Sequence, residues 1–254
     1  MLTFGIVSAK ATADIHKNIE TIAYYAQKAQ AVGCTALCFP ECFLTGYSRE
    51  HAHGRAISMD SEPCRQVADL ASKWNMDLLV GLMETNRESY SINHSIFYPN
   101  GAVRSYRKTH LGTRESEIFT PGASLNVFPL TCGISIGFQL CVETHFPEIT
   151  QTLALHGASL IFAPHAVPSA AGNRETIWNK YIPARSYDNR VHMACCNLWD
   201  EERYGGGLLV TAPDGEIVIS SYKNAPEMVT FKMEPERNWS KYFFPDKRRP
   251  ELYR

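Results

Sequence analysis

The chain alternates between short apolar runs and longer stretches in which apolar residues recur at helical spacing. Short runs bounded by turn residues predict strands, and they lie at 3–8, 34–39, 76–84, 158–163 and 191–198. Helical spacing predicts helices, and it occurs at 13–32, 62–74, 146–156 and 174–189. Pro99-Asn100-Gly101 and Pro213-Asp214-Gly215 predict hairpin turns. Helices that alternate with strands, with hairpins between them, indicate an α/β protein with mixed sheets.

The two halves of the chain repeat the same order of signals. GCTALCFP at 33–40 and GASLIFAP at 157–164 are both Gly-led strands that follow a helix and end in Pro. Each half also begins with a similar apolar strand, FGIVSA or CGISIGF, and later contains a hairpin, FYPNGAV or TAPDGEI. This repetition predicts two pseudo-equivalent β-rich halves packed sheet to sheet, with helices outside. Because no linker-like segment separates the halves, we expect a single domain over 1–254.

The composition is that of an ordinary soluble globular protein, with 44% hydrophobic and 20% charged residues and a net charge of -1. Basic residues gather only in the short cluster at 247–249, so we expect neither nucleic acid nor a membrane surface as a partner. The first residues lack an export signal, and no stretch has membrane-spanning length. The expected location is therefore the cytoplasm.

The eight cysteines show no paired CxxC spacing. Reduced thiols are therefore expected rather than disulfides or a zinc site, and no metal or cofactor is predicted. Cys195 and Cys196 lie in the apolar run VHMACCNLW, which predicts buried strand residues.

Cys141 lies at the join of a predicted strand and a following helix, in the stretch GISIGFQLCVETHFPE at 133–148. A nucleophile at such a join is raised above the sheet and lies near the positive end of the helix, which lowers the pKa of a thiol. The alternative is a buried structural cysteine.

Three other residues are candidates for chemistry. Glu41 follows Phe39-Pro40 at a strand end, Lys108 ends the strand after the first hairpin, and Glu115 lies in the loop RESEIFTPG. Taken singly, they suit a solvated carboxylate, an edge-strand lysine and a capping carboxylate. The repeat, however, makes Glu41 and His165 equivalent, and both strand ends would face a shared crevice near Cys141.

Four motifs in order resemble the nitrilase, or carbon-nitrogen hydrolase, superfamily. They are FPE at 39–41, YRKTHL at 106–111, ESEIFTPG at 115–122 and GFQLCVETHFPE at 137–148. The GGG…PDG hairpin and the closing RRPELY at 248–253 are also similar to that family, so the resemblance covers nearly the whole chain.

The resemblance implies a four-layer αββα sandwich and a Glu-Lys-Cys triad. Glu41 would be the general base, Lys108 the oxyanion stabiliser together with the backbone N–H of Val142, and Cys141 the nucleophile. Glu115 matches a further carboxylate that positions substrate and triad.

The resemblance also implies a homodimer or larger homo-oligomer. The aromatic and basic tail NWSKYFFPDKRR at 238–249 could pack against the partner copy.

The sequence departs from the family pattern just after Cys141, where the usual amidase form CYDxRFPE is replaced by CVETHFPE. His145 replaces an Arg, and a histidine is a weaker and pH-dependent partner for an anion. Glu143 replaces an Asp, as in the Cys-Trp-Glu sequence of true nitrilases, but Val142 is not Trp.

Walls of the substrate pocket are expected from Tyr47, His165 to Pro168, Arg174 and Trp178, and Val142 and His145 are further substrate-binding positions. Trp178 equally suits the core, and Arg174 equally suits a solvated helix start.

The predicted activity is release of ammonia from a small linear amide through a cysteine thioester. Hydrolysis of an N-carbamoyl amine or amino acid, hydrolysis of a nitrile, and a catalytically silent binding protein stay open as alternatives. A Cys-His protease or zinc module built on Cys141 and His145 lacks a second ligand pair in the sequence.

Overall fold

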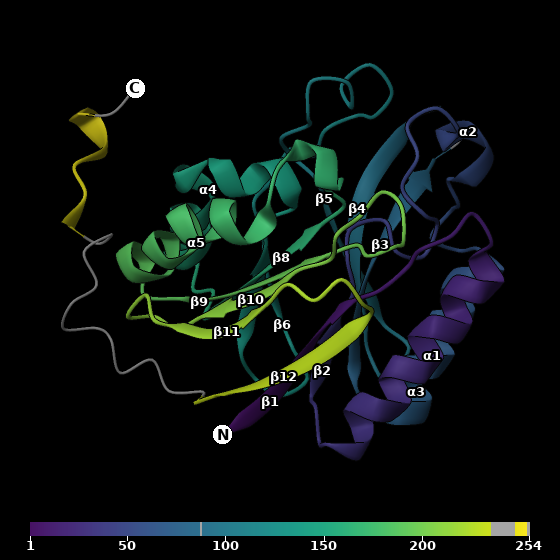
Figure 1. The fold of residues 1–254 in the computed structure, drawn as a ribbon, viewed down its shortest axis with the longest axis horizontal. Helices are drawn as coiled ribbons and strands as arrows, with labels where there is room; N and C mark the ends of the chain where they lie inside the picture. Colours follow the sequence, from purple (N-terminus) through teal and green to yellow (C-terminus); the bar gives the residue numbers. More distant parts are fainter. Residues whose placement is uncertain (87, 235–246, 253–254) are drawn as a thin grey trace.

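The computed structural model describes residues 1–86, 88–234 and 247–252 (Figure 1). Over these residues the chain forms two six-stranded sheets that pack face to face. The first sheet has the order β12-β1-β2-β3-β4-β5. Its strands are β1 (Leu2–Ser8), β2 (Ala36–Cys38), β3 (Asp77–Thr85), β4 (Tyr90–Phe97), β5 (Val103–Arg107) and β12 (Glu227–Met233).

The second sheet has the order β11-β10-β9-β8-β7-β6. Its strands are β6 (Val127–Pro129), β7 (Ser135–Phe138), β8 (Leu160–His165), β9 (His192–Asn197), β10 (Leu208–Thr211) and β11 (Ile217–Ser221). In Figure 1, α1 (Ile15–Ala31) and α3 (Glu62–Trp74) cover the outer face of the first sheet, and α4 (Pro147–Leu155) and α5 (Arg174–Asn189) cover that of the second. The predicted four-layer αββα sandwich is therefore confirmed.

The internal duplication is visible in the strand pairing. In the first sheet β1, β2 and β3 are parallel, and β4 and β5 follow as antiparallel hairpin strands. In the second sheet β7, β8 and β9 are parallel, and β10 and β11 follow in the same way. Gly33 and Gly157, at equivalent helix-to-strand turns, both have positive φ, 74° and 98°. The two halves therefore repeat one unit, as the sequence predicted.

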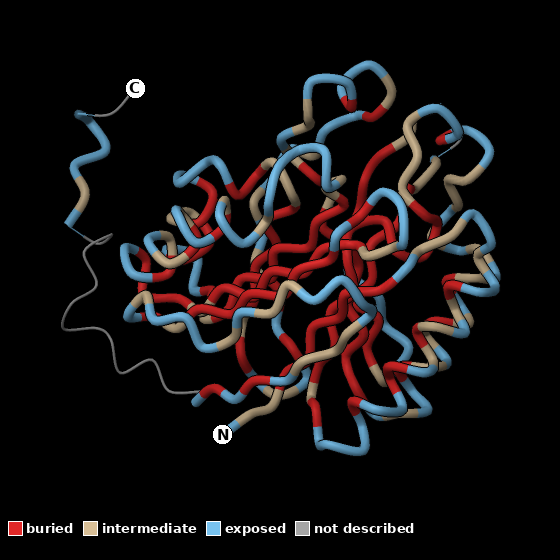
Figure 2. The backbone as a smooth tube through the Cα atoms, viewed as in Figure 1, coloured by how far each residue is buried: buried red, intermediate tan, exposed pale blue. Residues whose placement is uncertain are grey.

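Alternation along the strands assigns each apolar side chain to one of two layers. On β8, Leu160 and Phe162 belong to the core between the sheets, whereas Ile161 and Ala163 pack beneath the helices of the second half. A strand that is buried on both faces reads as a continuous apolar run, which is why these runs were recognisable. Figure 2 shows the buried segments concentrated in the strands.

Helix starts follow from local capping. The Asp14 side chain accepts hydrogen bonds from the backbone N–H groups of His16 (3.0 Å) and Lys17 (3.4 Å), and α1 begins at Ile15. The Asn173 side chain caps α5 in the same way by accepting from Thr176 N–H at 2.8 Å.

Several elements of the described residues lie outside the predicted set. They are the strands β6 and β12, the short helix α2 (Ala52–Arg55) and the 3-10 helices η2 (Ser169–Ala171) and η5 (Pro250–Leu252). β12 pairs antiparallel with β1, from the other end of the chain, so its place in the sheet depends on tertiary contact rather than on a local signal.

The eight cysteines are free, and Cys195 and Cys196 are buried on β9 as predicted. Most of the tail predicted to contact a partner, 238–246, lies outside the described residues. Among the helices that the structure describes, none is long and apolar enough to cross a membrane.

Candidate active site

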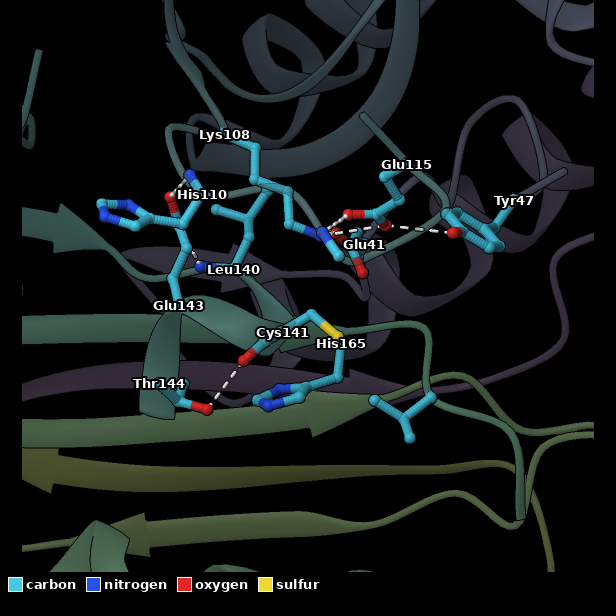
Figure 3. Close-up of polar contacts among 12 residues, drawn as sticks. Glu41, Tyr47, Lys108, His110, Glu115, Leu140, Cys141, Glu143, Thr144 and His165 are labelled. Carbon is cyan, nitrogen blue, oxygen red and sulfur yellow. Dashed lines mark hydrogen bonds and ion pairs between the residues drawn. The ribbon is translucent and has the colours of Figure 1, made fainter. Parts of the chain in front are cut away.

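Three strand ends bring the predicted residues together. Glu41 follows β2, Lys108 follows β5 and Cys141 follows β7. Glu41 is 1% exposed and Lys108 is fully buried, whereas Cys141 is partly exposed. Figure 3 shows Cys141 beside the cluster formed by Lys108 and its carboxylate partners. Two halves of the chain, one supplying the Glu and Lys and the other the Cys, therefore meet at one place.

The Lys108 ammonium lies between two carboxylates. Its Nζ atom is 2.8 Å from Glu41 Oε1 and 2.9 Å from Glu115 Oε2. A buried charge is tolerated when it is paired and hydrogen-bonded. This pairing gives one cation and two carboxylates, so the cluster can hold a net negative charge next to the thiol.

Glu115 is held by further donors. Tyr47 Oη donates to Glu115 Oε1 at 3.0 Å, and the backbone N–H of Gly112 donates to Oε2 at 2.7 Å. Burial would raise the pKa of Glu115, but attraction to Lys108 and these hydrogen bonds lower it below its ordinary value. Glu115 is therefore the carboxylate of the cluster that stays ionised.

Glu41 differs from Glu115 in its electrostatics. Burial raises the pKa of Glu41 to about 7, the nearby Lys108 opposes this rise, and repulsion from Glu115 adds to it. A carboxyl group that titrates near neutral pH can both take and return a proton. Two carboxylates with separated pKa values around one lysine are typical of assigned acid-base and structural roles.

Lys108 is a permanent cation in this setting. Burial lowers its pKa, but attraction to Glu41, Cys141 and Glu115 outweighs burial and raises the pKa well above its ordinary value. Its charge is thus available wherever a negative charge develops nearby.

Cys141 has a left-handed backbone conformation, with a φ of 48°. It begins the short 3-10 helix η1 (Cys141–His145), which leads into α4 at Pro147. A non-glycine residue at positive φ is strained and persists where surrounding structure enforces it, often at functional sites.

The prediction of a lowered thiol pKa was wrong. Burial and the charge of Glu41 raise the pKa of Cys141 to about 12, although Lys108 and a hydrogen bond with the backbone of Ala166 lower it in part. The α-helix begins only at Pro147, six positions further along, so its positive end is not at the sulfur atom. The resting thiol is therefore protonated.

Tyr47 and His165, predicted as pocket walls, both lie at the site. Tyr47 contacts the cluster through Glu115. His165 ends β8 and is 1% exposed, with Nδ1 2.8 Å from the carbonyl oxygen of Ala163. Burial lowers the pKa of His165 to about 3, so its ring is neutral. Figure 3 shows this ring below Cys141.

Trp178 takes the core alternative. It is fully buried on α5, where it belongs to the apolar cluster between the second sheet and its helices, and its ring centroid is 4.7 Å from that of His165. Trp178 therefore packs against the His165 ring from the side of the helices that cover the second sheet.

His145, Arg174 and Val142 lie nearer the surface. The exposed His145 ring packs 5.1 Å from the Tyr181 ring, and burial and the charge of Arg174 lower its pKa. Arg174 is the first residue of α5 and donates to the carbonyl oxygen of Ala171 at 2.8 Å. Val142 is partly exposed in η1, directly after the nucleophile position.

Sequence reasoning missed the polar groups that hold these segments. Glu143 is fully buried and accepts hydrogen bonds from the Lys108 segment and from Leu140 N–H. Gln139 donates to the backbone carbonyl oxygens of Glu143 (2.7 Å) and Phe146 (3.1 Å). Gln139 is a polar residue between apolar neighbours at the end of β7, and Glu143 is a charged residue next to the predicted nucleophile, which was the available signal.

Within the described ranges, no group of three or more His, Cys, Asp or Glu side chains is placed to hold a metal ion. At the cluster itself, the Lys108 ammonium occupies the position between the two carboxylates.

The fold and the cluster define a class of protein. The sequence matches the family model of carbon-nitrogen hydrolases over residues 4–237. The chain therefore belongs to the carbon-nitrogen hydrolase family.

Particular relatives span most of the chain. A Pseudomonas protegens protein named hydrolase in pqqF 5'region is 30% identical, over 94% of this chain and 86% of its own length. A nitrilase of Pyrococcus abyssi is 27% identical, over 84% of this chain and 81% of its own length. Omega-amidase NIT2-B of Xenopus laevis is 26% identical, over 85% of this chain and 81% of its own length.

Solved structures share the fold. The NitN amidase from Nesterenkonia sp. AN1 superposes with a TM-score of 0.88 at 23% identity, covering 100% of this chain and 98% of that one.

Proposed function

We propose that the protein hydrolyses the carbon-nitrogen bond of a small linear amide, giving an acid and ammonia through a thioester on Cys141. The observation that carries the proposal is the buried Lys108 ammonium, bound to Glu41 and Glu115 and lying beside Cys141. Amide cleavage needs a nucleophile, a proton carrier and a positive group near the carbonyl oxygen. This cluster contains all three.

In the first step Glu41 takes the proton of the Cys141 thiol as the sulfur attacks the carbonyl carbon. Because the thiol pKa is raised to about 12, proton transfer accompanies the attack rather than preceding it. Lys108 and the backbone N–H of Val142 stabilise the oxyanion. The carbon-nitrogen bond then breaks, and the protonated Glu41 returns its proton to the nitrogen, which leaves as ammonia.

In the second step water hydrolyses the thioester. Glu41, ionised again, takes a proton from water as the oxygen attacks the thioester carbon. The carbon-sulfur bond breaks, the acid leaves, and Glu41 passes the proton taken from water to the Cys141 sulfur, which restores the thiol and the ionised carboxylate. Glu115 stays ionised throughout and holds Lys108 with Tyr47 behind it.

Related proteins support an amide substrate. The Nesterenkonia amidase has been solved as a cysteine-to-alanine mutant in complex with butyramide. Another of its mutants shows covalent addition of the acetamide moiety of fluoroacetamide at the active-site cysteine. The omega-amidase relative also carries an amidase name.

The test is ammonia release measured across a panel of short aliphatic amides, N-carbamoyl compounds and nitriles. Short amides are expected to be turned over fastest. A clear preference for N-carbamoyl compounds or nitriles would replace the amide assignment, and no turnover of any class would favour a binding protein.

Replacing the nucleophile tests the role of Cys141, and replacing a second cysteine provides the matched control. Cys141→Ala should abolish turnover and the acyl adduct detected by intact-mass spectrometry, while Cys132→Ala, at a partly exposed cysteine in the turn before β7, should leave both unchanged. Turnover that survives Cys141→Ala would remove the nucleophile assignment.

A further inference from the structure

Glu143 occupies the junction between the segment that carries Lys108 and the segment that carries Cys141. It is fully buried in η1, two residues after Cys141. Figure 3 shows its carboxylate between His110 on one side and Leu140 on the other. The proposed chemistry assigns no step to this group, although a buried carboxylate is costly without a full set of partners.

One oxygen of Glu143 binds the Lys108 segment. Oε1 accepts hydrogen bonds from Tyr106 Oη, Thr109 N–H and Thr109 Oγ1, each at 2.7 Å, and from His110 N–H at 3.2 Å. Tyr106 precedes Lys108 by two positions, and Thr109 and His110 follow it directly. The chain is therefore held on both sides of Lys108, through the Tyr106 side chain before it and through the backbone N–H groups of Thr109 and His110 after it.

The other oxygen binds the Cys141 segment. Oε2 accepts from Leu140 N–H, directly before Cys141, at 2.7 Å. The backbone carbonyl of Glu143 in turn accepts from Gln139 Nε2 at 2.7 Å. A single side chain thus joins the end of β5 in the first sheet to the end of β7 in the second.

We infer that Glu143 is a positioning residue that sets the separation between the Lys108 ammonium and the Cys141 sulfur. It acts through the segments next to these two groups, by hydrogen bonds to their backbone N–H groups and side-chain hydroxyls, and does not touch the substrate. The inference about catalysis rests on the proposed function, but the placement of the two segments does not.

The chemistry of a carboxylate explains the choice of residue. The described residues direct five donors at the two oxygens. An ionised carboxylate has about four acceptor sites and no hydrogen of its own, so these donors use all of its accepting capacity. A glutamine of the same shape would turn an NH₂ group toward at least one of these donors. The two segments would then separate until that donor found another partner.

Catalysis is sensitive to such a shift, because a misplacement of about 1 Å can cost about 10²-fold in rate. Glu143→Gln should therefore lower kcat by about 10²-fold, with KM nearly unchanged, since the contacts to bound amide are retained. The measurement is steady-state kinetics on the best amide of the panel, corrected for the folded fraction.

Asp77→Asn is the matched control. Asp77 is also a fully buried carboxylate that joins the two sheets, accepting from Thr131 N–H at 2.8 Å and Thr131 Oγ1 at 2.5 Å. It lies at the start of β3, and Thr131 lies before β7, at the ends of these strands away from the site. Asp77→Asn should lower the melting temperature but leave kcat unchanged. Equal kcat values for the two folded variants would overturn the positioning role.

A milder variant serves if Glu143→Gln does not fold. Tyr106→Phe removes one donor to Glu143 and keeps every charge, so kcat should fall by about fivefold, the worth of one hydrogen bond. An unchanged kcat in Tyr106→Phe would count against the inference.

Alkylation of Cys141 by 2-chloroacetamide separates this inference from the proposed function. Lys108 lowers the pKa of the thiol, so displacing Lys108 should slow alkylation, followed at Cys141 by peptide mass spectrometry. Slower alkylation in Glu143→Gln and Tyr106→Phe, with a wild type that cleaves no panel compound, would retain the positioning role and reject the amidase. Wild-type alkylation rates in these two variants would reject the positioning role.

Discussion

At the scale of single residues, the site depends on how three ionisable groups share one buried place. Lys108 forms an ion pair with Glu41 and with Glu115 at once, and both carboxylates are buried away from water. Breaking a buried ion pair by removing one partner costs about 3–5 kcal/mol, because the remaining charge is left uncompensated. The lysine is therefore expected to matter for stability as well as for the oxyanion.

Lys108→Met should lower kcat by about 10²-fold or more, as the loss of an oxyanion donor does. It should also lower the free energy of unfolding at neutral pH, because two carboxylates then face each other without a cation. Kinetics and urea unfolding measure the two effects.

Lys10→Met provides the comparison, since Lys10 pairs with Glu201 at 2.6 Å on the surface. Such exposed pairs contribute little, so both quantities should stay close to wild type. A kcat for Lys108→Met equal to that of Lys10→Met would refute the oxyanion role.

The pH dependence of kcat/KM should report Glu41. Only its ionised form accepts the thiol proton, so a pKa of about 7 means that activity is low below this pH and rises through it. The profile is measured with the best amide in the free-enzyme regime of low substrate. An acid limb near 4.5, the ordinary value, would show that Glu41 is not the base or is not buried in solution.

At the scale of elements, the site is built from strand ends whose loops pass close to neighbouring strands. The loop that carries Glu41 crosses β3 at Gly81, where an added Cβ would lie 2.4 Å from the backbone nitrogen of Cys42 and 2.9 Å from the carbonyl oxygen of Pro40. Backbone atoms cannot move aside as a flexible side chain can. Gly81 therefore allows the loop to place Glu41 against Lys108.

Gly81→Ala should push this loop away from β3. We expect a loss of about 1–3 kcal/mol in unfolding free energy, as for other overpacked sites, and a fall in kcat of about 10-fold or more from the displaced base. Gly54→Ala, at a helical position with nothing within 4 Å of the added carbon, is the control: kcat should stay at the wild-type value and the free energy of unfolding should not fall. Wild-type kcat in Gly81→Ala would show that the loop adapts without moving Glu41.

At the scale of the whole molecule, the two sheets must stay packed for the site to exist. The first half of the chain contributes Glu41, Lys108 and Glu115, and the second half contributes Cys141. Phe138, the last residue of β7, fills the space between the sheets, with ring centroids 4.8 Å from His94 and 5.9 Å from Phe128. The register of the two halves depends on this core.

Phe138→Ala should lower the free energy of unfolding by about 3–5 kcal/mol, because it removes a buried ring and leaves a cavity between the sheets. Val218→Ala, on β11 with 52% of its surface exposed, should change it by less than about 0.5 kcal/mol. Denaturant unfolding compares them. A loss in Phe138→Ala as small as that in Val218→Ala would mean that the intersheet core is not what joins the halves.

The local pattern was enough to predict most of the fold. The helix over 62–74 was predicted with the bounds that α3 has, and the repeat of Gly-led strands revealed the duplication. These signals are local, because burial on both faces produces apolar runs and a helix shows its own periodicity. The strand β12 escaped prediction because only its pairing with β1 makes it part of the sheet.

For the candidate site too, some features were predicted from the sequence and others depended on tertiary packing. Residue types and motif order singled out Glu41, Lys108, Glu115 and Cys141, and the structure places them together, while their roles stay predictions. Trp178 was assigned between core and pocket, and only the packing of α5 on the second sheet decided for the core. Glu143 was noticed as an unusual residue, but four of the five donors it binds come from a segment 33 to 37 positions away.

The sequence by itself therefore determined most of the elements, that they occur twice, and which side chains are suited to chemistry, because these properties depend on neighbours along the chain. The tertiary structure alone decided the protonation of these side chains. Burial raises the pKa of Cys141 to about 12, whereas the expected helix start predicted a lowered thiol pKa. Burial also raises the pKa of Glu41 to about 7. Desolvation and charge act through space, so they follow from which segments the fold brings together.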